Sequence, residues 1–280
     1  MSSWVITGVS RGLGFEFLRQ LSENPGNTVF GLVRDKAAVE AKVADEIDRQ
    51  NIHIIQADTT DPVALEKAAQ FVSEKTNGTL DYVIANAALQ AKTALVGFDT
   101  LSHDPKALEQ DVIDHFRVNT IGAIHLFNVF MPLILKGQAK KVIAISTGMS
   151  DPEMTLKADI YQATSYAMSK AALNMAVAKF SAVYREQDVL CMAICPGAVD
   201  TGSLNIETEE EGQLAMAMFE KFKQYSPTFQ GPMSPEDSAK SVLALVNKAN
   251  VNGGYADTAQ KEFSGRHEGL VTYKAVQKGR

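Results

Sequence analysis

Short apolar runs alternate with longer segments of mixed character along most of the chain. The apolar runs are continuous rather than alternating, and they occupy residues 4–7, 28–33, 53–56, 81–85, 141–146 and 189–195. Continuous runs of this length are typical of strands buried on both faces of a parallel sheet. Helical periodicity characterises the segments between them, at 14–22, 36–49, 62–75, 162–185 and 234–248, with one or two more helices expected within 105–135. The pattern predicts an α/β fold, a doubly wound parallel sheet with helices on both faces.

The regular alternation stops after residue 201. Residues 202–235 hold an acidic patch and then an apolar segment with large side chains, namely Leu214, Met216, Met218, Phe219 and Phe222. The chain then returns to a helix opened by Ser234 and Pro235, and residues 253–257 are a candidate edge strand. We expect a single domain over residues 1–280, in which 1–201 form the core and 236–280 a last helix and edge strand.

Composition and charge exclude several classes of function. The chain has 280 residues, of which 45% are hydrophobic and 21% charged, and its formal net charge is -6. Such a chain supports one sizeable core and has no general attraction to nucleic acid or anionic membranes. No signal peptide is predicted, and the apolar stretch 121–135 is too short and too polar to span a bilayer. We therefore expect a cytoplasmic protein whose partner is a small molecule.

The cysteines and histidines narrow the chemistry further. Cys191 and Cys195 are four residues apart in one predicted strand. At ~3.3 Å per residue their Cα atoms would be about 13 Å apart, too far for a disulfide bond. We expect two buried thiols, which suits a reducing compartment. The five histidines show no metal-ligand spacing, so no metal site is predicted.

A glycine-rich turn, residues 7–14 (TGVSRGLG), joins the first predicted strand to the first helix. Small residues let the backbone approach a pyrophosphate, and the helix N-terminus attracts its negative charge, so the turn predicts a dinucleotide site. A cation after the second strand suits the 2′-phosphate of NADP, whereas a carboxylate there suits the ribose of NAD. Arg34 and Arg11 therefore favour NADP, while a shift of one residue would place Asp35 at the ribose and favour NAD.

Tyr166 and Lys170 are four residues apart, and so they lie on one face of the predicted helix 162–185. Hydride transfer to a carbonyl carbon leaves negative charge on the oxygen, which then requires a proton donor. The pKa of a free tyrosine is about 10, and a nearby ammonium group lowers it by stabilising the phenolate. The pair therefore predicts that Tyr166 donates the proton with the assistance of Lys170.

Together the motifs resemble those of the short-chain dehydrogenase/reductase family, in the same order, over residues 7–201. The similarity comprises T-G-x-x-x-G-x-G in the turn, Asn86-Ala87-Ala88 where the family has N-N-A-G, Tyr-x-x-x-Lys, and P-G-x-x-x-T at 196–201. Ala85 and Ala88 depart from the family pattern. The resemblance implies a Rossmann fold and an NADP cofactor held by Gly8, Ser10, Arg11, Gly12, Leu13, Gly14, Arg34, Asp58, Thr59, Asn86, Tyr166, Lys170, Pro196, Gly197, Val199 and Thr201.

The resemblance also implies two further catalytic groups. In the family a hydroxyl group after the fifth strand holds the substrate oxygen, and the candidates here are Thr147 and its neighbour Ser146. Asn119 resembles the family's helix asparagine, which binds a water molecule that links the lysine to solvent. The segment between Thr147 and Tyr166 is longer than is usual in the family, and we expect a loop there.

The implied function is the NADPH-dependent reduction of an aldehyde or ketone, and the layout most resembles carbonyl-reductase-like members, including fungal ketoreductases. Residues 202–235 would form a small lid over an apolar substrate, or alternatively an ordinary amphipathic helix packed on the core. Competing hypotheses are the oxidation of a secondary alcohol, a cofactor-using isomerase, and a non-catalytic NADP-binding regulator. Members of the family pair through the helices that correspond to those carrying Asn119 and Tyr166, which implies a homodimer or homotetramer.

Overall fold

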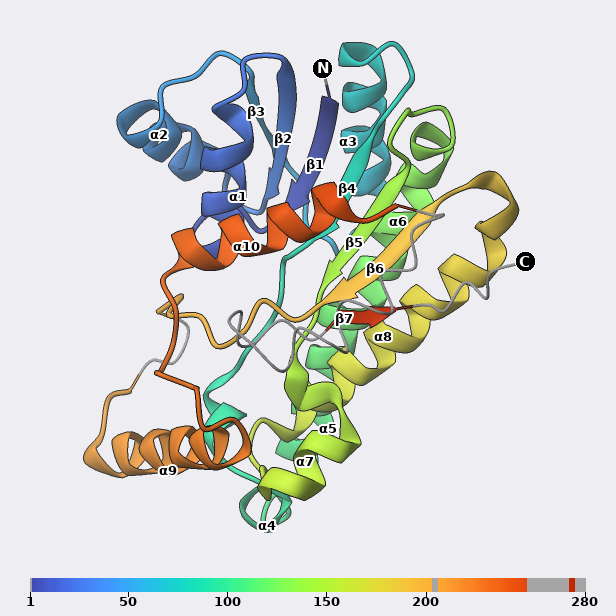
Figure 1. Cartoon of the computed structure of the whole chain (residues 1–280). Coiled ribbons are helices and arrows are strands. Elements are labelled where there is room, and N and C mark those ends of the chain that lie inside the picture. Colours follow the sequence, from blue (N-terminus) through green and yellow to red (C-terminus); the bar gives the residue numbers. More distant parts are fainter. Residues whose placement is uncertain (1, 203–205, 251–271, 275–280) are drawn as a thin grey trace.

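A seven-stranded sheet with the order β3-β2-β1-β4-β5-β6-β7 forms the centre of the molecule (Figure 1). The computed structural model describes residues 2–202, 206–250 and 272–274. Six strands are parallel: β1 Ser2–Thr7, β2 Asn27–Val33, β3 Ile52–Gln56, β4 Tyr82–Ala85, β5 Lys141–Ile145 and β6 Leu190–Ile194. The short strand β7, Thr272–Lys274, pairs with β6 in the antiparallel direction. The predicted parallel sheet is confirmed, and the candidate edge strand at 253–257 lies outside the described residues.

Helices cover both faces of the sheet, as the doubly wound pattern predicts (Figure 1). One apolar core packs the sheet against α1 Gly12–Ser22, α2 Lys36–Glu46 and α10 Pro235–Lys248. The other core packs it against α3 Pro62–Lys75, α6 Gly122–Ile134 and α8 Thr164–Val183. The strand order reverses between β1 and β4, and in such sheets ligands bind at the carboxyl ends of the strands beside this point.

Helix starts follow the capping residues of the sequence. The side chain of Asp61 accepts hydrogen bonds from the amides of Val63 and Ala64, and Pro62 takes the first helical position of α3. Ser234 caps α10 in the same way by accepting from the amide of Asp237. These caps satisfy amide groups that no helical carbonyl reaches, and they fix where each helix begins.

Two segments differ from the simplest expectation. The segment 105–135 forms helices α5 Pro105–His115 and α6, joined by a π-helical turn, Phe116–Ile121. The loop expected between Thr147 and Tyr166 was a wrong prediction in part, because Pro152–Ala158 forms a helix, α7. Asp151 accepts a hydrogen bond from the amide of Glu153, and Pro152 occupies the first turn, so this short sequence carries its own start signal.

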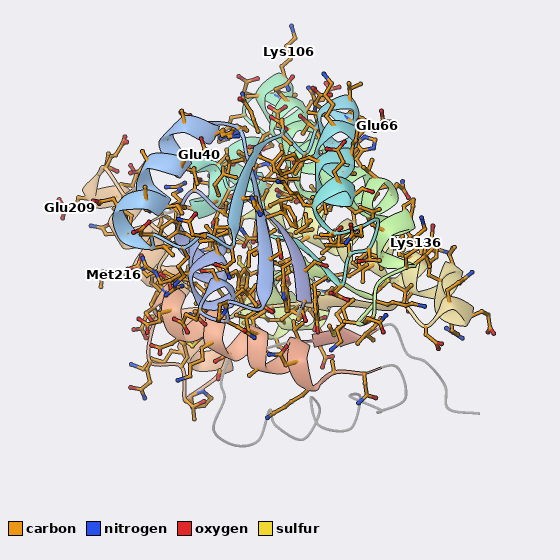
Figure 2. The ribbon with its side chains drawn as sticks, turned by 90° about the horizontal axis from the view of Figure 1, so that it is seen from above. Glu40, Glu66, Lys106, Lys136, Glu209 and Met216 are labelled. Carbon is orange, nitrogen blue, oxygen red and sulfur yellow. The ribbon has the colours of Figure 1, made fainter. Side chains whose placement is uncertain are left out.

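The segment after residue 206 forms helix α9, Glu209–Tyr225, which lies with α7 and the short helix α4, Phe98–Leu101, at the lower end of Figure 1. Ala215 and Met218 are buried against Leu95, whereas Met216 is 69% exposed. Figure 2 shows Met216 at the periphery of the molecule, where charged side chains such as Glu209 also lie. None of the helices in the described part of the chain has the length and apolarity needed to cross a membrane.

Candidate active site

The glycine-rich turn packs against the loop that follows β4. Gly8 has a φ of 73°, and a Cβ there would lie 2.8 Å from the Cα of Ala87. A Cβ on Gly14 would overlap the carbonyl oxygen of Gly8 and would lie 2.5 Å from Nδ2 of Asn86. Side chains at these two positions would therefore push the two loops apart. The glycines therefore allow the two loops to pack closely at the N-terminus of α1, where backbone amides are able to bind a phosphate group.

Asn86 holds the two loops together. Its Nδ2 donates to the carbonyl oxygens of Thr7 at 3.0 Å and Gly8 at 3.2 Å. The hydroxyl of Thr7 accepts in return from the amides of Asn86 and Ala87, both at 3.0 Å. Although Ala85 and Ala88 depart from the family pattern, the remaining Asn86 still forms the junction between β1 and β4.

The loop after β6 lies over the same turn. Gly197 has a φ of 83°, and a Cβ on Gly12 would lie 3.0 Å from Cβ of Thr201. The loop is anchored from the C-terminal side, because Ser238 donates to the carbonyl oxygen of Pro196 at 2.8 Å and Val199 bridges to Met233. Sequence reasoning missed Ser238 and Met233, which come from the start of α10 and the segment before it.

Cations lie around the outer end of the turn. Arg11 and Arg34 are both exposed, and the guanidinium of Arg11 lies 3.5 Å from the carbonyl oxygen of Gly202. Asp35 is occupied elsewhere, because its carboxylate caps α2 by accepting from the amide of Ala38 at 3.1 Å. Lys42, which the sequence analysis did not single out, donates to the carbonyl oxygen of Ser10 at 3.4 Å.

Asp58 follows β3 at the same edge of the sheet. One oxygen of its carboxylate accepts from both the amide and the hydroxyl of Thr60 at 2.8 Å. The hydroxyl of Thr59 lies against α6, since a Cβ on Gly122 would meet it at 2.9 Å. Both residues thus lie beyond the carboxyl end of β3, which pairs with β2 at the outer edge of the sheet.

Tyr166 and Lys170 lie one turn apart on α8, and the Lys170 amino group is 5.7 Å from the centre of the Tyr166 ring. Lys170 is 2% exposed and donates to the carbonyl oxygen of Ile145 at 2.6 Å. Burial lowers the pKa of Lys170 to about 8. Burial also raises the pKa of Tyr166 well above its ordinary value, and the adjacent Cys195 thiol raises it further, so the lowered tyrosine pKa expected from the sequence was a wrong prediction. Tyr166 is consequently a phenol, able to donate a proton, at neutral pH.

Asn119 lies in the π-helical turn and is 1% exposed. Its amide exchanges hydrogen bonds with the backbone of Leu89, accepting at 2.7 Å and donating at 3.0 Å. It also donates to the hydroxyl of Ser169 at 3.0 Å, and that hydroxyl in turn donates to the carbonyl oxygen of Tyr166 at 2.7 Å. The wide turn therefore brings Asn119 against the helix that carries Tyr166 and Lys170.

The two candidate hydroxyl groups differ in their surroundings. Ser146 is 2% exposed, and its hydroxyl donates to Oδ1 of Asn174 at 2.6 Å. Thr147 is partly exposed, and its hydroxyl accepts from the amide of Met149 at 3.3 Å. Cys195 supports the same turn, because its sulfur accepts from the amide of Gly148 at 3.1 Å. Cys195 and Cys191 are both buried, and burial raises the pKa of the Cys191 thiol to about 12.

Comparison with known proteins defines the family. A family model described as short chain dehydrogenase matches residues 3–212, so the chain belongs to the short-chain dehydrogenase/reductase family and is an oxidoreductase. Members of this family bind a nicotinamide cofactor. The turn around Gly8 and Gly14 fits such a cofactor, because the absence of side chains there lets the turn pack closely on Ala87 and Asn86 at the N-terminus of α1.

Two fungal relatives and one solved structure illustrate the similarity. Short chain dehydrogenase virK of Hypocrea virens is 50% identical over 256 residues, which covers 91% of this chain and 94% of virK. Short-chain dehydrogenase/reductase iacC of Pestalotiopsis fici is 42% identical over 262 residues, which covers 91% of this chain and 95% of iacC. The NADPH-bound carbonyl reductase from chicken fatty liver has a TM-score of 0.70 and 25% identity, covering 90% of this chain and 93% of its own.

Proposed function

We propose that the protein reduces an aldehyde or ketone to an alcohol with NADPH, and that Tyr166 donates the proton. The observation that carries the proposal is the pairing of Tyr166 with a buried Lys170 at the end of β5, beside the junction of the glycine turn and Asn86. A protonated Tyr166 is the form that reduction requires, because the oxygen of the product must gain a proton.

Several contacts support NADP over NAD. Arg34 directly follows β2 and is exposed, while Asp35, the residue that would favour NAD, is committed to the cap of α2. Arg11 and Lys42 add two further cations beside the turn. Converging cations stabilise a dianionic 2′-phosphate, for which arginine is well suited as a bidentate donor.

Each residue of the site has a separate role in the proposed reduction. The bound cofactor supplies the hydride. Thr147 or Ser146 holds the carbonyl oxygen of the substrate, and Tyr166 gives it the proton. Lys170 holds positive charge near the phenol and thereby stabilises the phenolate that remains. Asn119 lies against α8, where it supports a water-mediated path that returns a proton to Lys170.

We further propose that the chain forms a single domain in which one helix covers the substrate as a lid. In this proposal α9 is the lid, because Met218 packs with Leu95 and Met149, and Met149 lies two residues beyond Thr147. Lys221 of α9 donates to the carbonyl oxygen of Asp159 at 2.6 Å, which ties the helix to the segment before Tyr166. An apolar lid favours an apolar carbonyl substrate.

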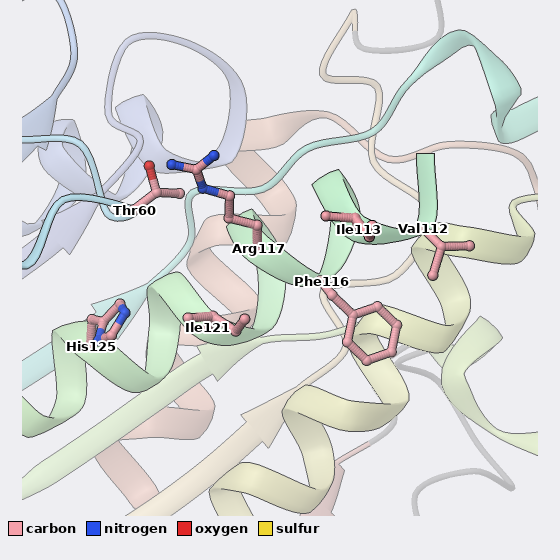
Figure 3. Close-up of a pocket in the computed structure, with 7 residues that line it drawn as sticks. All are labelled: Thr60, Val112, Ile113, Phe116, Arg117, Ile121 and His125. Carbon is pink, nitrogen blue, oxygen red and sulfur yellow. The ribbon is translucent and has the colours of Figure 1, made fainter. Parts of the chain in front are cut away.

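An exposed apolar groove and two buried thiols support our proposal for assembly and location. A groove of about 560 Å³ runs along α5, the π-helical turn and α6 (Figure 3), and its lining includes Ile113 and Ile121, which are 48% and 44% exposed. We assign this face to a second copy of the chain in a homodimer or homotetramer, since apolar patches of this kind mark protein interfaces. The buried thiols of Cys191 and Cys195 suit the reducing cytoplasm.

The test is the oxidation of NADPH by a panel of aldehydes, ketones and quinones, with NADH as the comparison. Tyr166→Phe should lose about 100-fold or more of the turnover, the usual contribution of a positioned proton donor. Tyr161→Phe is the matched control, because Tyr161 is half exposed and packs under Lys221. Full activity of Tyr166→Phe would refute the mechanism. Tight NADPH binding with no turnover of any carbonyl compound would favour the non-catalytic regulator, and turnover of secondary alcohols alone would favour the dehydrogenase.

A further inference from the structure

A closed set of hydrogen bonds connects α8 to the turn after β5. Ser146 Oγ donates to Asn174 Oδ1 at 2.6 Å, and Asn174 Nδ2 donates to Ser150 Oγ at 2.8 Å. Ser150 Oγ then donates to the carbonyl oxygen of Thr147 at 2.6 Å. The three bonds enclose the turn that carries both candidate hydroxyl groups.

Asn174 lies on the face of α8 that also carries the reacting groups. Tyr166, Lys170 and Asn174 follow one another at intervals of four residues, which places them in one row along the helix. Lys170 contacts the last residue of β5, and Asn174 contacts the first residue after it, Ser146. The same row therefore holds the end of the strand and the turn in register with Tyr166.

The direction of each bond in this set is fixed by chemistry. The carbonyl oxygen of Thr147 can only accept, so the proton of the Ser150 hydroxyl is used there. Ser150 must then accept from Asn174, which turns the NH₂ of the amide toward Ser150 and its oxygen toward Ser146. An amide oxygen also only accepts, and the proton of the Ser146 hydroxyl is therefore committed to Asn174.

The hydroxyl of Thr147 accepts a hydrogen bond, whereas that of Ser146 donates one. The hydroxyl oxygen of Thr147 accepts from the amide of Met149, which uses a lone pair and leaves the hydroxyl proton available for a substrate oxygen. We propose that Asn174 is a positioning residue, which takes up the hydroxyl of Ser146, sets the turn through Ser150, and leaves Thr147 as the group that holds the substrate carbonyl. This inference rests on the proposed function and names the hydroxyl group within that site.

The other anchors of the turn come from β6. The amide of Ser146 donates to the carbonyl oxygen of Ile194 at 2.7 Å, and the amide of Gly148 donates to the sulfur of Cys195. These bonds fix the turn relative to the sheet, whereas Asn174 fixes it relative to α8. Loss of Asn174 should therefore change the placement of Thr147 against Tyr166 without unfolding the sheet.

The first test compares kinetic constants for 4-nitrobenzaldehyde and NADPH. Thr147→Ala should lower kcat by about 100-fold or more, as for the loss of one hydrogen-bond donor to a developing oxyanion, and Thr147→Ser should restore it. Asn174→Ala should lower kcat by about 10- to 100-fold through misplacement, with the NADPH dissociation constant unchanged. Ser146→Ala should cost no more than Asn174→Ala, and combining the two should add no further loss.

Asn174→Asp separates the two arms of the set. The new carboxylate keeps an acceptor for Ser146 but has no donor for Ser150, so its kcat should lie between those of the wild type and Asn174→Ala. Ser181→Ala removes a buried hydroxyl from the same helix and serves as the control, with wild-type kcat expected. A loss in Ser146→Ala as large as in Thr147→Ala, or full activity in Thr147→Ala, would overturn the assignment.

Hydrogen–deuterium exchange tests the positioning role without turnover. Peptides covering residues 146–150 should exchange faster in Asn174→Ala than in the wild type, while β1 and β4 stay protected. Unchanged exchange of this turn would refute the role of Asn174. Full activity of Tyr166→Phe, by contrast, would refute the proposed function and leave the exchange result intact.

Discussion

The amino group of Lys170 donates a hydrogen bond of 2.6 Å to the carbonyl oxygen of Ile145, the last residue of β5. The bond joins the middle of α8 to the end of a central strand and keeps the Lys170 side chain pointed at the site. Because Lys170 is 2% exposed, its charged form loses most of its hydration. The same contact that positions Lys170 therefore also makes its charge sensitive to pH.

The burial of Lys170 predicts how stability depends on pH without cofactor. The pKa of Lys170 is lowered to about 8 in the folded protein from 10.5, so the unfolded chain binds the proton more tightly. The cost of burying the charged amino group of Lys170 is fully present below pH 8 and is lost as the pH rises toward 10.5. Deprotonation of Lys170 therefore increases the free energy of unfolding by about 3 kcal/mol over that range. Urea unfolding at several pH values measures it.

The matched comparison uses two substitutions on the same helix. Lys170→Met should remove the increase between pH 8 and 10.5, whereas Lys179→Met, which replaces an exposed lysine of α8, should keep it. At each pH, the free energy of unfolding of each variant is subtracted from that of the wild type. The difference cancels the contribution of Cys191, whose raised pKa lowers the free energy of unfolding at higher pH. Equal slopes in the wild type and in Lys170→Met would show that Lys170 does not titrate in this range.

Alanine substitutions at two helical glycines, Gly14 and Gly212, should change stability in opposite directions. A Cβ on Gly14 would overlap the carbonyl oxygen of Gly8 and press on Asn86, so Gly14→Ala should destabilise the fold by about 1–3 kcal/mol and abolish tight NADPH binding. Gly212 lies in α9 with its nearest neighbour 3.8 Å from the added carbon. Gly212→Ala should instead stabilise by up to about 1 kcal/mol. Thermal unfolding measures the stability of both variants, and NADPH fluorescence measures their cofactor binding. Normal NADPH binding in Gly14→Ala would contradict the role of this turn in holding the cofactor.

Much of this fold follows from local signals in the sequence. The continuous apolar runs locate the parallel strands, and the pairs Asp61-Pro62 and Ser234-Pro235 locate the starts of α3 and α10. These features depend on neighbouring residues alone, so a single sequence suffices to predict them. The motif spacing likewise predicts that Tyr166 and Lys170 share one helix face, because that spacing matches the helical period.

The remaining features depend on contacts between distant segments. The bond from Ser238 to Pro196 and the one from Ser146 to Asn174 join residues 42 and 28 positions apart, and no local pattern marks them. The burial of Met218 and the exposure of Met216 depend on which face of α9 meets Leu95. The start of helix α7 is marked locally by Asp151-Pro152. The helix was nevertheless missed, because the extra length of this segment was interpreted as a loop.

Arg34 is expected to determine the choice of cofactor. Arg34→Ala should raise the KM for NADPH by about 10- to 100-fold and leave that for NADH nearly unchanged, since a charged hydrogen bond contributes about 1.5–3 kcal/mol. Arg11→Ala should have an effect in the same direction. Arg185→Ala is the control, because Arg185 is an exposed arginine in the turn that follows the end of α8. Equal effects on NADPH and NADH would mean that Arg34 does not contact the 2′-phosphate.

The lid predicts opposite outcomes for two methionines of α9. Met218 is 5% exposed and packs with Leu95 and Met149, whereas Met216 is 69% exposed. Met218→Ala should loosen α9 over the turn that carries Thr147, and so raise the KM for an apolar carbonyl substrate while the KM for NADPH stays the same. Met216→Ala should leave both constants unchanged, because its side chain contributes little packing. Steady-state kinetics with a series of aldehydes of increasing chain length measures the effect, which should grow with chain length as more apolar surface reaches the lid. A uniform loss across the series, equal for the shortest and the longest aldehyde, would instead place α9 outside the substrate site and favour an ordinary amphipathic helix packed on the core.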